Sequence, residues 1–179
     1  AAFSAPGQTM VSSDPSFHPL MLWAEKFGVG HVKVPWSADH HIDLERIEDS
    51  ITEKTSLAYV CNPENPVGTL APPADLYAFC KRVSEKCPVL VDEAYIEYAG
   101  KVDELSMMRC VREGLPVIVL RTFSKAYGLG GMRIGYAVTF EITPGASDLE
   151  AERYDGSPAL WRDEHRESYM LYSDPYFQN

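Results

Sequence analysis

The stretch that organises this chain is Leu120-Arg-Thr-Phe-Ser-Lys-Ala-Tyr-Gly-Leu-Gly-Gly-Met-Arg-Ile-Gly135. The apolar run 117–120 leads into it and predicts a buried strand. Polar residues 121–124 then predict a turn that presents one lysine, Lys125, and Arg133 follows later in the stretch. Glycines lie between the two, and glycine lets a backbone approach a ligand closely or adopt a positive φ. The stretch therefore predicts a ligand-binding loop at the end of a strand.

The chemistry of this loop suits an aldehyde that carries a phosphate group. A lysine amine forms a Schiff base with an aldehyde, and an arginine guanidinium binds a phosphate through two parallel hydrogen bonds. Lys125 and Arg133 can supply these two groups, and Thr122 and Ser124 add hydroxyls beside them. The simpler alternative is that Lys125 is a solvated loop lysine and that the glycines form ordinary turns.

Composition excludes several classes of function. The net charge of −10 argues against nucleic acid or an anionic membrane as a partner, and no apolar stretch reaches the length of a membrane span. The cysteines form no CxxC pair and no cluster with histidine, so no metal site is expected. Reduced thiols in a cytoplasmic protein are the simplest interpretation.

Strand and helix patterns alternate along most of the chain, which predicts an α/β unit with a mainly parallel sheet flanked by helices. Strands are expected at 29–35, 56–61, 88–91, 117–120 and 134–138, and helices at 18–27, 39–50 and 72–86. Leu22 and Phe27 are expected to face inward from the first helix, and Asp43 to cap the second. Residues 14–17 predict a turn, and 96–112 predict polar surface and helix.

Two further predicted strands end in polar side chains that could bind a ligand. The turn Asn62-Pro63-Glu64-Asn65-Pro66-Val67-Gly68 is rigid because of its prolines, and Asn65 can donate its amide there. Asp92 directly follows an apolar strand, where a carboxylate is costly to bury unless it is paired; the alternative is that it caps the next helix. Ligands bind beyond the carboxyl ends of parallel strands. We therefore expect Asn65, Asp92, Tyr95, Lys125 and Arg133 to converge on one pocket at this edge.

Together these motifs resemble those of the class I and II aminotransferases that use pyridoxal 5'-phosphate. The sequence of the stretch around Lys125 is most similar to the histidinol-phosphate aminotransferase branch. The resemblance covers about 17–138. Val67 departs from the family's Asn-Pro-x-Asn-Pro-Thr-Gly, because it replaces the threonine. The resemblance implies the large cofactor-binding domain of a fold-type I enzyme, here incomplete.

The resemblance also implies catalytic roles for residues of this chain. Lys125 would bind the cofactor aldehyde and later carry the proton that moves during transfer. Asp92 would hold the ring nitrogen in its protonated form, which makes the ring an electron sink. Asn65 and Tyr95 would bond to the phenolic oxygen of the ring.

The remaining implied contacts hold the cofactor in place. Thr122, Ser124 and Arg133 would bind the phosphate. Phe17, in Pro-Ser-Phe, resembles the aromatic residue that stacks on the ring, and a core phenylalanine is the alternative.

The implied reaction is amino transfer between histidinol phosphate and 2-oxoglutarate, in a cytoplasmic homodimer with small-molecule substrates and no nucleic-acid or membrane partner. Other enzymes of the branch stay open, such as an aromatic aminotransferase or a threonine-phosphate decarboxylase. A cofactor-binding fragment without turnover and a plain structural α/β domain stay open as well.

The resemblance ends near residue 140. Residues 1–140 are expected to form a partial cofactor-binding large domain, and 141–179 an acidic tail that contains Trp161 and four tyrosines. The family's N-terminal phosphate loop and its C-terminal substrate arginine have no assignable counterpart in this sequence. The sequence therefore predicts a fragment that binds the cofactor weakly at best and does not transaminate by itself.

Overall fold

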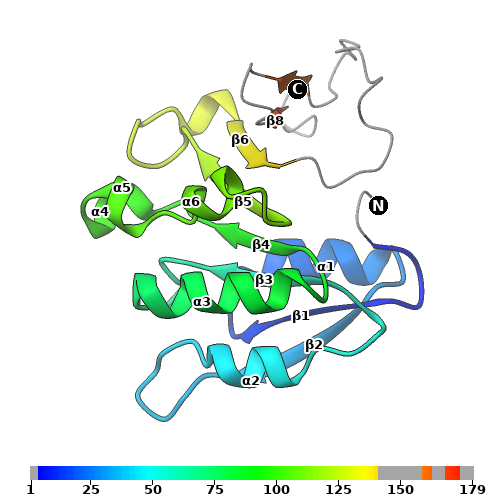
Figure 1. Cartoon of the computed structure of the whole chain (residues 1–179). Helices are drawn as coiled ribbons and strands as arrows, with labels where there is room; N and C mark the ends of the chain where they lie inside the picture. Colours follow the sequence, from blue (N-terminus) through cyan, green and yellow to red (C-terminus); the bar gives the residue numbers. More distant parts are fainter. Residues whose placement is uncertain (1–3, 141–158, 163–167, 174–179) are drawn as a thin grey trace.

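The computed structural model describes residues 4–140, 159–162 and 168–173. Its strands are β1 (Thr9–Asp14), β2 (Gly30–Pro35), β3 (Thr55–Cys61), β4 (Val89–Asp92), β5 (Val117–Thr122), β6 (Ile134–Thr139), β7 (Ala159–Arg162) and β8 (Ser168–Ser173). In this part of the chain they form one sheet in the order β2-β1-β3-β4-β5-β6-β8-β7 (Figure 1). The first five in that order are parallel, and the last three are antiparallel to their neighbours. The predicted α/β class with a mainly parallel sheet is confirmed.

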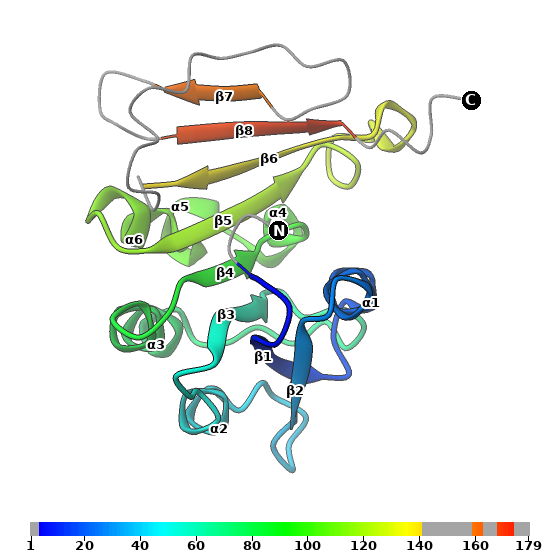
Figure 2. The same ribbon diagram turned by 90° about the vertical axis from the view of Figure 1, so that its right-hand side faces the viewer.

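Helices cover both faces of the parallel part of the sheet. Figure 2 shows α1 on one face and α2 and α3 on the other. The helices are α1 (His18–Lys26), α2 (Leu44–Asp49), α3 (Pro73–Ser84), α4 (Ile96–Ala99), α5 (Val102–Leu105) and α6 (Met108–Arg112), with a 3₁₀ turn η1 (Gly130–Met132). Among the described residues, no helix is both long and apolar enough to cross a membrane.

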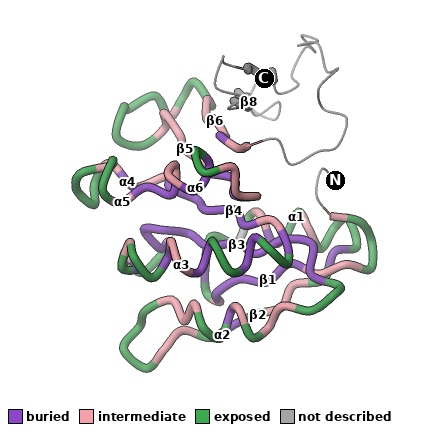
Figure 3. The backbone as a smooth tube through the Cα atoms, viewed as in Figure 1, coloured by how far each residue is buried: buried purple, intermediate pink, exposed green. Residues whose placement is uncertain are grey.

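The core has two parts because the sheet buries both faces, and Figure 3 shows the central strands β3 and β4 largely in the colour of buried residues. The larger part lies under α2, α3 and α6, and α3 contributes its predicted apolar stripe to it: Leu76, Phe79, Cys80 and Val83. β3 is buried along its whole length, as a central strand covered on both faces should be. Asp43 caps α2 as predicted, because its carboxylate accepts a hydrogen bond from the Arg46 N–H.

The predicted inward face of α1 was wrong. Leu22 and Phe27 are 52% and 56% exposed, whereas Met21 is buried against the sheet with Leu20 and Ala24 beside it. Residues three apart share a helix face, so Met21 and Ala24 turn inward together. Leu22 is one position further on and therefore points away from them.

Strand β1 was not predicted. It lies between β2 and β3, yet the sequence around it is rich in Ser and Pro. Only Met10 and Val11 are large apolar residues there, and the next two buried positions are Ser12 and Ser13. Polar residues at buried positions hide the apolar pattern by which a strand is usually found.

The predicted turn 121–124 begins two residues later than expected. Arg121 and Thr122 belong to β5 because they pair with Tyr136 and Gly135 of the antiparallel neighbour β6. Gly135 is needed for this close pairing, since a Cβ atom there would lie 3.0 Å from the Arg121 carbonyl oxygen.

Candidate functional site

The carboxyl ends of three central strands lie side by side. Cys61 of β3 pairs with Asp92 of β4, and Asp92 pairs in turn with Leu120 of β5. The loops that follow these strands therefore begin at the same edge of the sheet. This is the edge at which parallel α/β sheets bind their ligands.

Asp92 is the buried carboxylate of this edge, with 9% of its surface exposed. Its Oδ1 accepts a hydrogen bond of 3.0 Å from the Ala94 N–H, and its Oδ2 accepts one of 3.1 Å from the Tyr59 hydroxyl. Burial raises the pKa of Asp92, while these two donors and the charge of Lys125 lower it. Asp92 does not cap the next helix, because α4 begins at Ile96 and the Asp92 bond goes to Ala94.

Tyr59 is a site residue that sequence reasoning missed. It is fully buried in β3, and its hydroxyl holds one oxygen of Asp92. Burial, followed by the nearby charge of Asp92, raises the pKa of Tyr59 far above its ordinary value, so the hydroxyl stays a donor. The sequence signal for this role was a tyrosine between aliphatic residues of the strand, since a buried Tyr hydroxyl usually has a hydrogen-bond partner.

Lys125 and Tyr95 meet although they follow different strands. The Lys125 Nζ lies 5.1 Å from the centre of the Tyr95 ring, within the range of a cation–π contact. Because Lys125 also acts electrostatically on Asp92, these three predicted residues lie in one neighbourhood. Lys125 itself is exposed, so its amine is open to a ligand.

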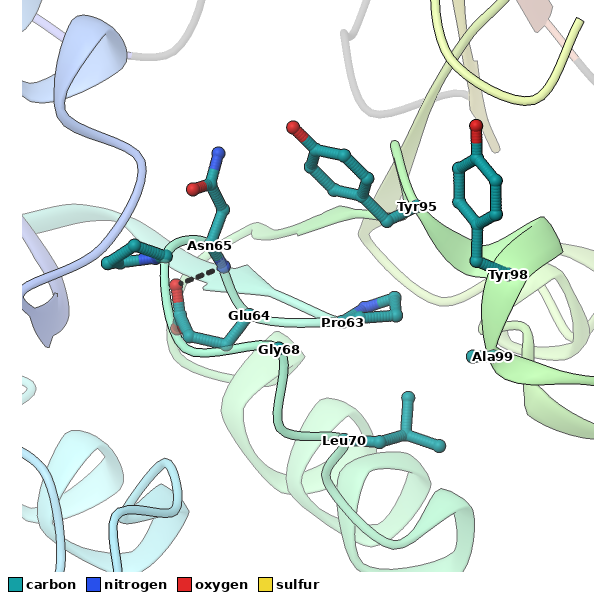
Figure 4. Close-up of a pocket in the computed structure, with 9 residues that line it drawn as sticks. Pro63, Glu64, Asn65, Gly68, Leu70, Tyr95, Tyr98 and Ala99 are labelled. Carbon is teal, nitrogen blue, oxygen red and sulfur yellow. Dashed lines mark hydrogen bonds between the residues drawn. The ribbon is translucent and has the colours of Figure 1, made fainter.

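A cavity of about 600 Å³ lies beside this group. Asn65 and Tyr95 both line it, and Figure 4 shows their side chains rising on the same side of the turn that follows β3. Leu70, Tyr98 and Pro63 add apolar surface to its wall. A largely apolar cavity with a few polar groups is the usual form of a small-molecule site.

Glu64 is a second residue that sequence reasoning missed. It is 2% exposed and also lines the cavity. Its carboxylate accepts hydrogen bonds from Ser13 Oγ at 3.0 Å, Ser16 Oγ at 2.8 Å and the Asn65 N–H at 2.9 Å. Burial raises its pKa to about 7 despite these donors. The sequence signal that could have pointed to Glu64 was a charged residue within a proline-rich turn.

The predicted phosphate-binding residues lie together on the Lys125 loop. Thr122 Oγ1 accepts a hydrogen bond of 3.0 Å from the Ser124 N–H and donates one of 3.4 Å to the Ile134 carbonyl. Arg133 is exposed, donates to the Gly130 carbonyl at 3.1 Å and has a left-handed backbone (φ 52°). Thr122 and Ser124 are thus joined by a hydrogen bond, and Arg133 is the residue before Ile134, whose carbonyl accepts a hydrogen bond from Thr122.

Phe17 lies next to this edge in the fold rather than in the core. It is 38% exposed and occupies the N-cap position of α1. Its neighbour Ser16 bonds to Glu64, which joins Phe17 to the turn of Asn65. The alternative of a core phenylalanine does not agree with this exposure.

The opposite face of the same strand end holds a separate polar group. Glu93 is 1% exposed and accepts hydrogen bonds from the Met107 N–H at 2.7 Å and from Arg121 Nη2 at 3.0 Å. Ser106 Oγ donates to it as well. This network links β4 and β5 on the face opposite Asp92.

In the part of the chain that the structure describes, no cluster of His, Cys, Asp and Glu could hold a metal ion.

The donor set fits an aromatic ring that carries a basic nitrogen and an aldehyde. A buried carboxylate needs a cationic partner, and a protonated ring nitrogen would supply one to Asp92. Lys125 offers the amine for the aldehyde, and Tyr95 and Asn65 offer donors for a ring oxygen. The residues present are therefore chemically suited to pyridoxal phosphate.

Residues 1–146 match the family model described as "Aminotransferase class I and II". The chain is 39% identical over 140 residues to the aromatic amino acid aminotransferase of Streptomyces coelicolor, which covers 78% of this chain and 39% of that protein. It is 42% identical over 134 residues to the histidinol-phosphate aminotransferase of Moorella thermoacetica, which covers 74% of this chain and 34% of that protein.

A solved structure is also similar to this chain. The crystal structure of histidinol-phosphate aminotransferase from Sinorhizobium meliloti, in complex with pyridoxal-5'-phosphate, superimposes with a TM-score of 0.69 at 33% sequence identity. The match covers 75% of this chain and 36% of that one. The chain thus spans less than two fifths of the length of each of these three relatives.

Proposed function

Because the chain belongs to the class I and II aminotransferase family, we propose that it carries the pyridoxal 5'-phosphate site of an aminotransferase. One observation carries the proposal: Lys125, which follows β5, lies against the ring of Tyr95 and acts on the charge of Asp92, both of which come at the end of β4, and Tyr95 lines a cavity together with Asn65. When bound, pyridoxal phosphate supplies an aldehyde that captures amino groups and a ring that withdraws electrons.

Each residue near the cavity has one task in this proposal. Lys125 would hold the cofactor through its aldehyde, and its amine would serve as the group that moves a proton at the substrate Cα. Asp92 keeps the proton on the ring nitrogen, and its two hydrogen bonds fix its direction. Asn65 and Tyr95 donate to the phenolic oxygen of the ring.

The phosphate end of the cofactor lies, in this proposal, against the Lys125 loop. Thr122, Ser124 and Arg133 hold the phosphate, and Phe17 packs on the ring face. Gly128 supports this loop, because its φ of +68° turns the chain in a conformation that side chains other than glycine rarely adopt.

The proposed amino substrate is histidinol phosphate, with 2-oxoglutarate as the acceptor. An aromatic amino acid is the second candidate, since relatives of both kinds are similar to this chain to a comparable degree. The tyrosines and Leu70 of the cavity wall suit an aromatic side chain. We further propose that 1–140 act as a partial large domain, that 141–179 are an acidic tail whose strands β8 and β7 extend its sheet, and that the chain acts as a cytoplasmic homodimer.

The first experiment is a titration of the protein with pyridoxal phosphate, followed by reduction with borohydride and mass spectrometry. The proposal expects a visible absorbance band and a covalent addition at Lys125. Lys125→Ala should lose both, while Lys101→Ala, at an exposed lysine paired with Glu104, should retain both. Modification spread evenly over several lysines, or none at all, would contradict the proposal.

The second experiment distinguishes the two substrates. Histidinol phosphate or phenylalanine is added to the protein with bound cofactor, and the loss of the visible band is followed in time. A response to histidinol phosphate alone supports the first candidate. A response to phenylalanine alone replaces it with the second.

A further inference from the structure

One carboxylate joins the neighbours of two proposed site residues that are far apart in the sequence. Ser16 directly precedes Phe17, and Asn65 directly follows Glu64. Glu64 Oε1 accepts hydrogen bonds from both Ser16 Oγ, at 2.8 Å, and the Asn65 N–H, at 2.9 Å. Glu64 Oε2 accepts a third from Ser13 Oγ at 3.0 Å.

The turn that carries Glu64 does not need this side chain to close. Its backbone is closed by hydrogen bonds from the Glu64 N–H to the Thr69 carbonyl, at 2.9 Å, and from the Gly68 N–H to the Glu64 carbonyl, at 2.7 Å. The side chain is instead directed at the end of β1, where both serines lie. The hydrogen bonds from Ser13 and Ser16 to the Glu64 carboxylate therefore connect the end of β1 to the turn after β3.

Burying a carboxylate is costly, and Glu64 is 2% exposed. A uniform apolar contact would join β1 to this turn without that cost. The Glu64 side chain adds direction, because hydrogen bonds have a preferred geometry and its oxygens accept from donors on both segments. The arrangement thus indicates that Glu64 fixes the relative position of the two segments rather than only holding them in contact.

We infer that Glu64 is a positioning residue, which holds the segment of Phe17 and the turn of Asn65 at a fixed separation. The inference rests on the proposed function, in which Phe17 packs on the ring face and Asn65 bonds to the ring edge. A ligand held from face and edge at once is sensitive to small shifts of either group. Glu64 touches neither the reacting atoms nor the proposed proton path.

The test compares three variants by pyridoxal phosphate titration. Glu64→Ala removes all three bonds and should weaken cofactor binding about tenfold or more, because a hydrogen bond to a charged group is lost on each segment. Glu64→Gln keeps an acceptor oxygen of the same shape and should stay within about threefold of the wild type. Glu48→Ala is the matched control, since Glu48 is an ion-paired carboxylate that bonds to Arg82 and Lys86.

A second readout does not depend on the cofactor. In the cofactor-free protein, amide hydrogen exchange at Asn65 should accelerate about tenfold in Glu64→Ala and remain near the wild-type rate in Glu64→Gln. Ser16→Ala, a smaller change that leaves the fold intact, should weaken cofactor binding without altering exchange at Asn65. If the wild type binds no cofactor, the proposed function fails. The exchange rates of the Asn65 amide in the variants and the wild type then test by themselves whether Glu64 holds Asn65 in place.

Three results would overturn the inference. The first is Glu64→Ala with wild-type cofactor affinity and wild-type exchange at Asn65. The second is Glu64→Gln as weak as Glu64→Ala in both measurements, which would assign the effect to charge instead of placement. The third is a loss of affinity in Glu48→Ala equal to that in Glu64→Ala, which would assign it to general stability.

Discussion

The Lys125 Nζ lies 5.1 Å from the centre of the Tyr95 ring. The two residues belong to loops that follow β5 and β4, so this contact joins two strand ends across the candidate site. A ring face attracts a cation and thereby limits where the flexible lysine side chain can reach. Tyr95 consequently has two separable features, a ring that holds the amine and a hydroxyl that can serve a ligand.

The first prediction separates these two features. Tyr95→Phe keeps the ring beside Lys125 and should weaken pyridoxal phosphate binding by about 0.5–1.5 kcal/mol, the usual net value of one hydrogen bond. Tyr95→Ala also loses the ring and should weaken binding further. Both are measured by absorbance titration, with Tyr98→Phe as the control in the same cavity. Equal affinity of Tyr95→Phe and the wild type would show that the hydroxyl does not contact the cofactor.

The second prediction concerns Asp92. Asp92→Asn replaces the buried carboxylate by a neutral amide, which cannot hold a proton on the ring nitrogen. In a complete, active version of this enzyme the proton-transfer barrier should rise by several kcal/mol, a loss of about two or more orders of magnitude in rate. The rate is measured as the loss of the visible cofactor band after addition of the amino substrate. Transamination close to the wild-type rate would show that Asp92 is the wrong residue.

Tyr59→Phe is a smaller change at the same site and is compared with Asp92→Asn. It leaves the Asp92 charge in place and removes only the donor to Oδ2. The rate should fall far less than in Asp92→Asn, because the Ala94 N–H still orients the carboxylate. A loss equal to that of Asp92→Asn would mean that Tyr59 acts on the ligand directly.

Much of the fold could be predicted because the sheet obeys simple rules. Each predicted strand is present, with its ends shifted by no more than two residues. β1 was missed because Ser12 and Ser13 occupy buried positions, and the Ser13 hydroxyl bonds to Glu64, which lies far away in the sequence. The inward face of α1 was wrong because Leu22 and Met21 are equally apolar, and only packing against the sheet selects one of them.

The site could be predicted in part for a related reason. Asp92 and Lys125 stand directly after apolar strands, and parallel topology alone brings such positions to one edge. Glu64 and Tyr59 escaped prediction, because their roles depend on tertiary partners. Ser16 approaches Glu64 only when β1 and β3 pair, and Tyr59 reaches Asp92 only across neighbouring strands.

The third prediction is a pH dependence of stability that comes from Glu64. Its folded pKa is about 7, above the ordinary value of 4.5. A carboxyl whose pKa is raised on folding binds protons more tightly in the folded state, so its contribution is fully present below pH 4.5 and is lost as the pH rises through 7. Between these limits Glu64 should lower the free energy of unfolding by on the order of 2–3 kcal/mol.

Glu64→Gln isolates this contribution, because the amide does not titrate. The free energy of unfolding is measured by urea denaturation at several pH values between 4.5 and 8. The difference between wild type and variant should change with pH in that window. Parallel stability curves for the two proteins would show that the pKa of Glu64 is not raised.

The last prediction concerns the ion pair behind the site. Glu93 and Arg121 are 3.0 Å apart, with side chains 1% and 14% exposed, so the removal of either leaves a buried charge without its main partner. Glu93→Leu should cost about 3–5 kcal/mol of unfolding free energy, the usual penalty for breaking a buried pair. Arg121→Met should also destabilise the protein, since Glu93 then keeps only its bonds to Ser106 and Met107.

The double variant Glu93→Leu and Arg121→Met tests the cause of that cost. If the loss comes from an unpaired buried charge, removing both charges should restore most of the stability, so that the two single effects are strongly non-additive. Denaturant unfolding followed by far-UV circular dichroism measures all three variants. Simple addition of the two losses would mean that each side chain stabilises the fold through separate contacts, Glu93 through the Met107 N–H and Arg121 through its packing. The pair would then not be the element that supports β4 and β5 behind Asp92 and Lys125.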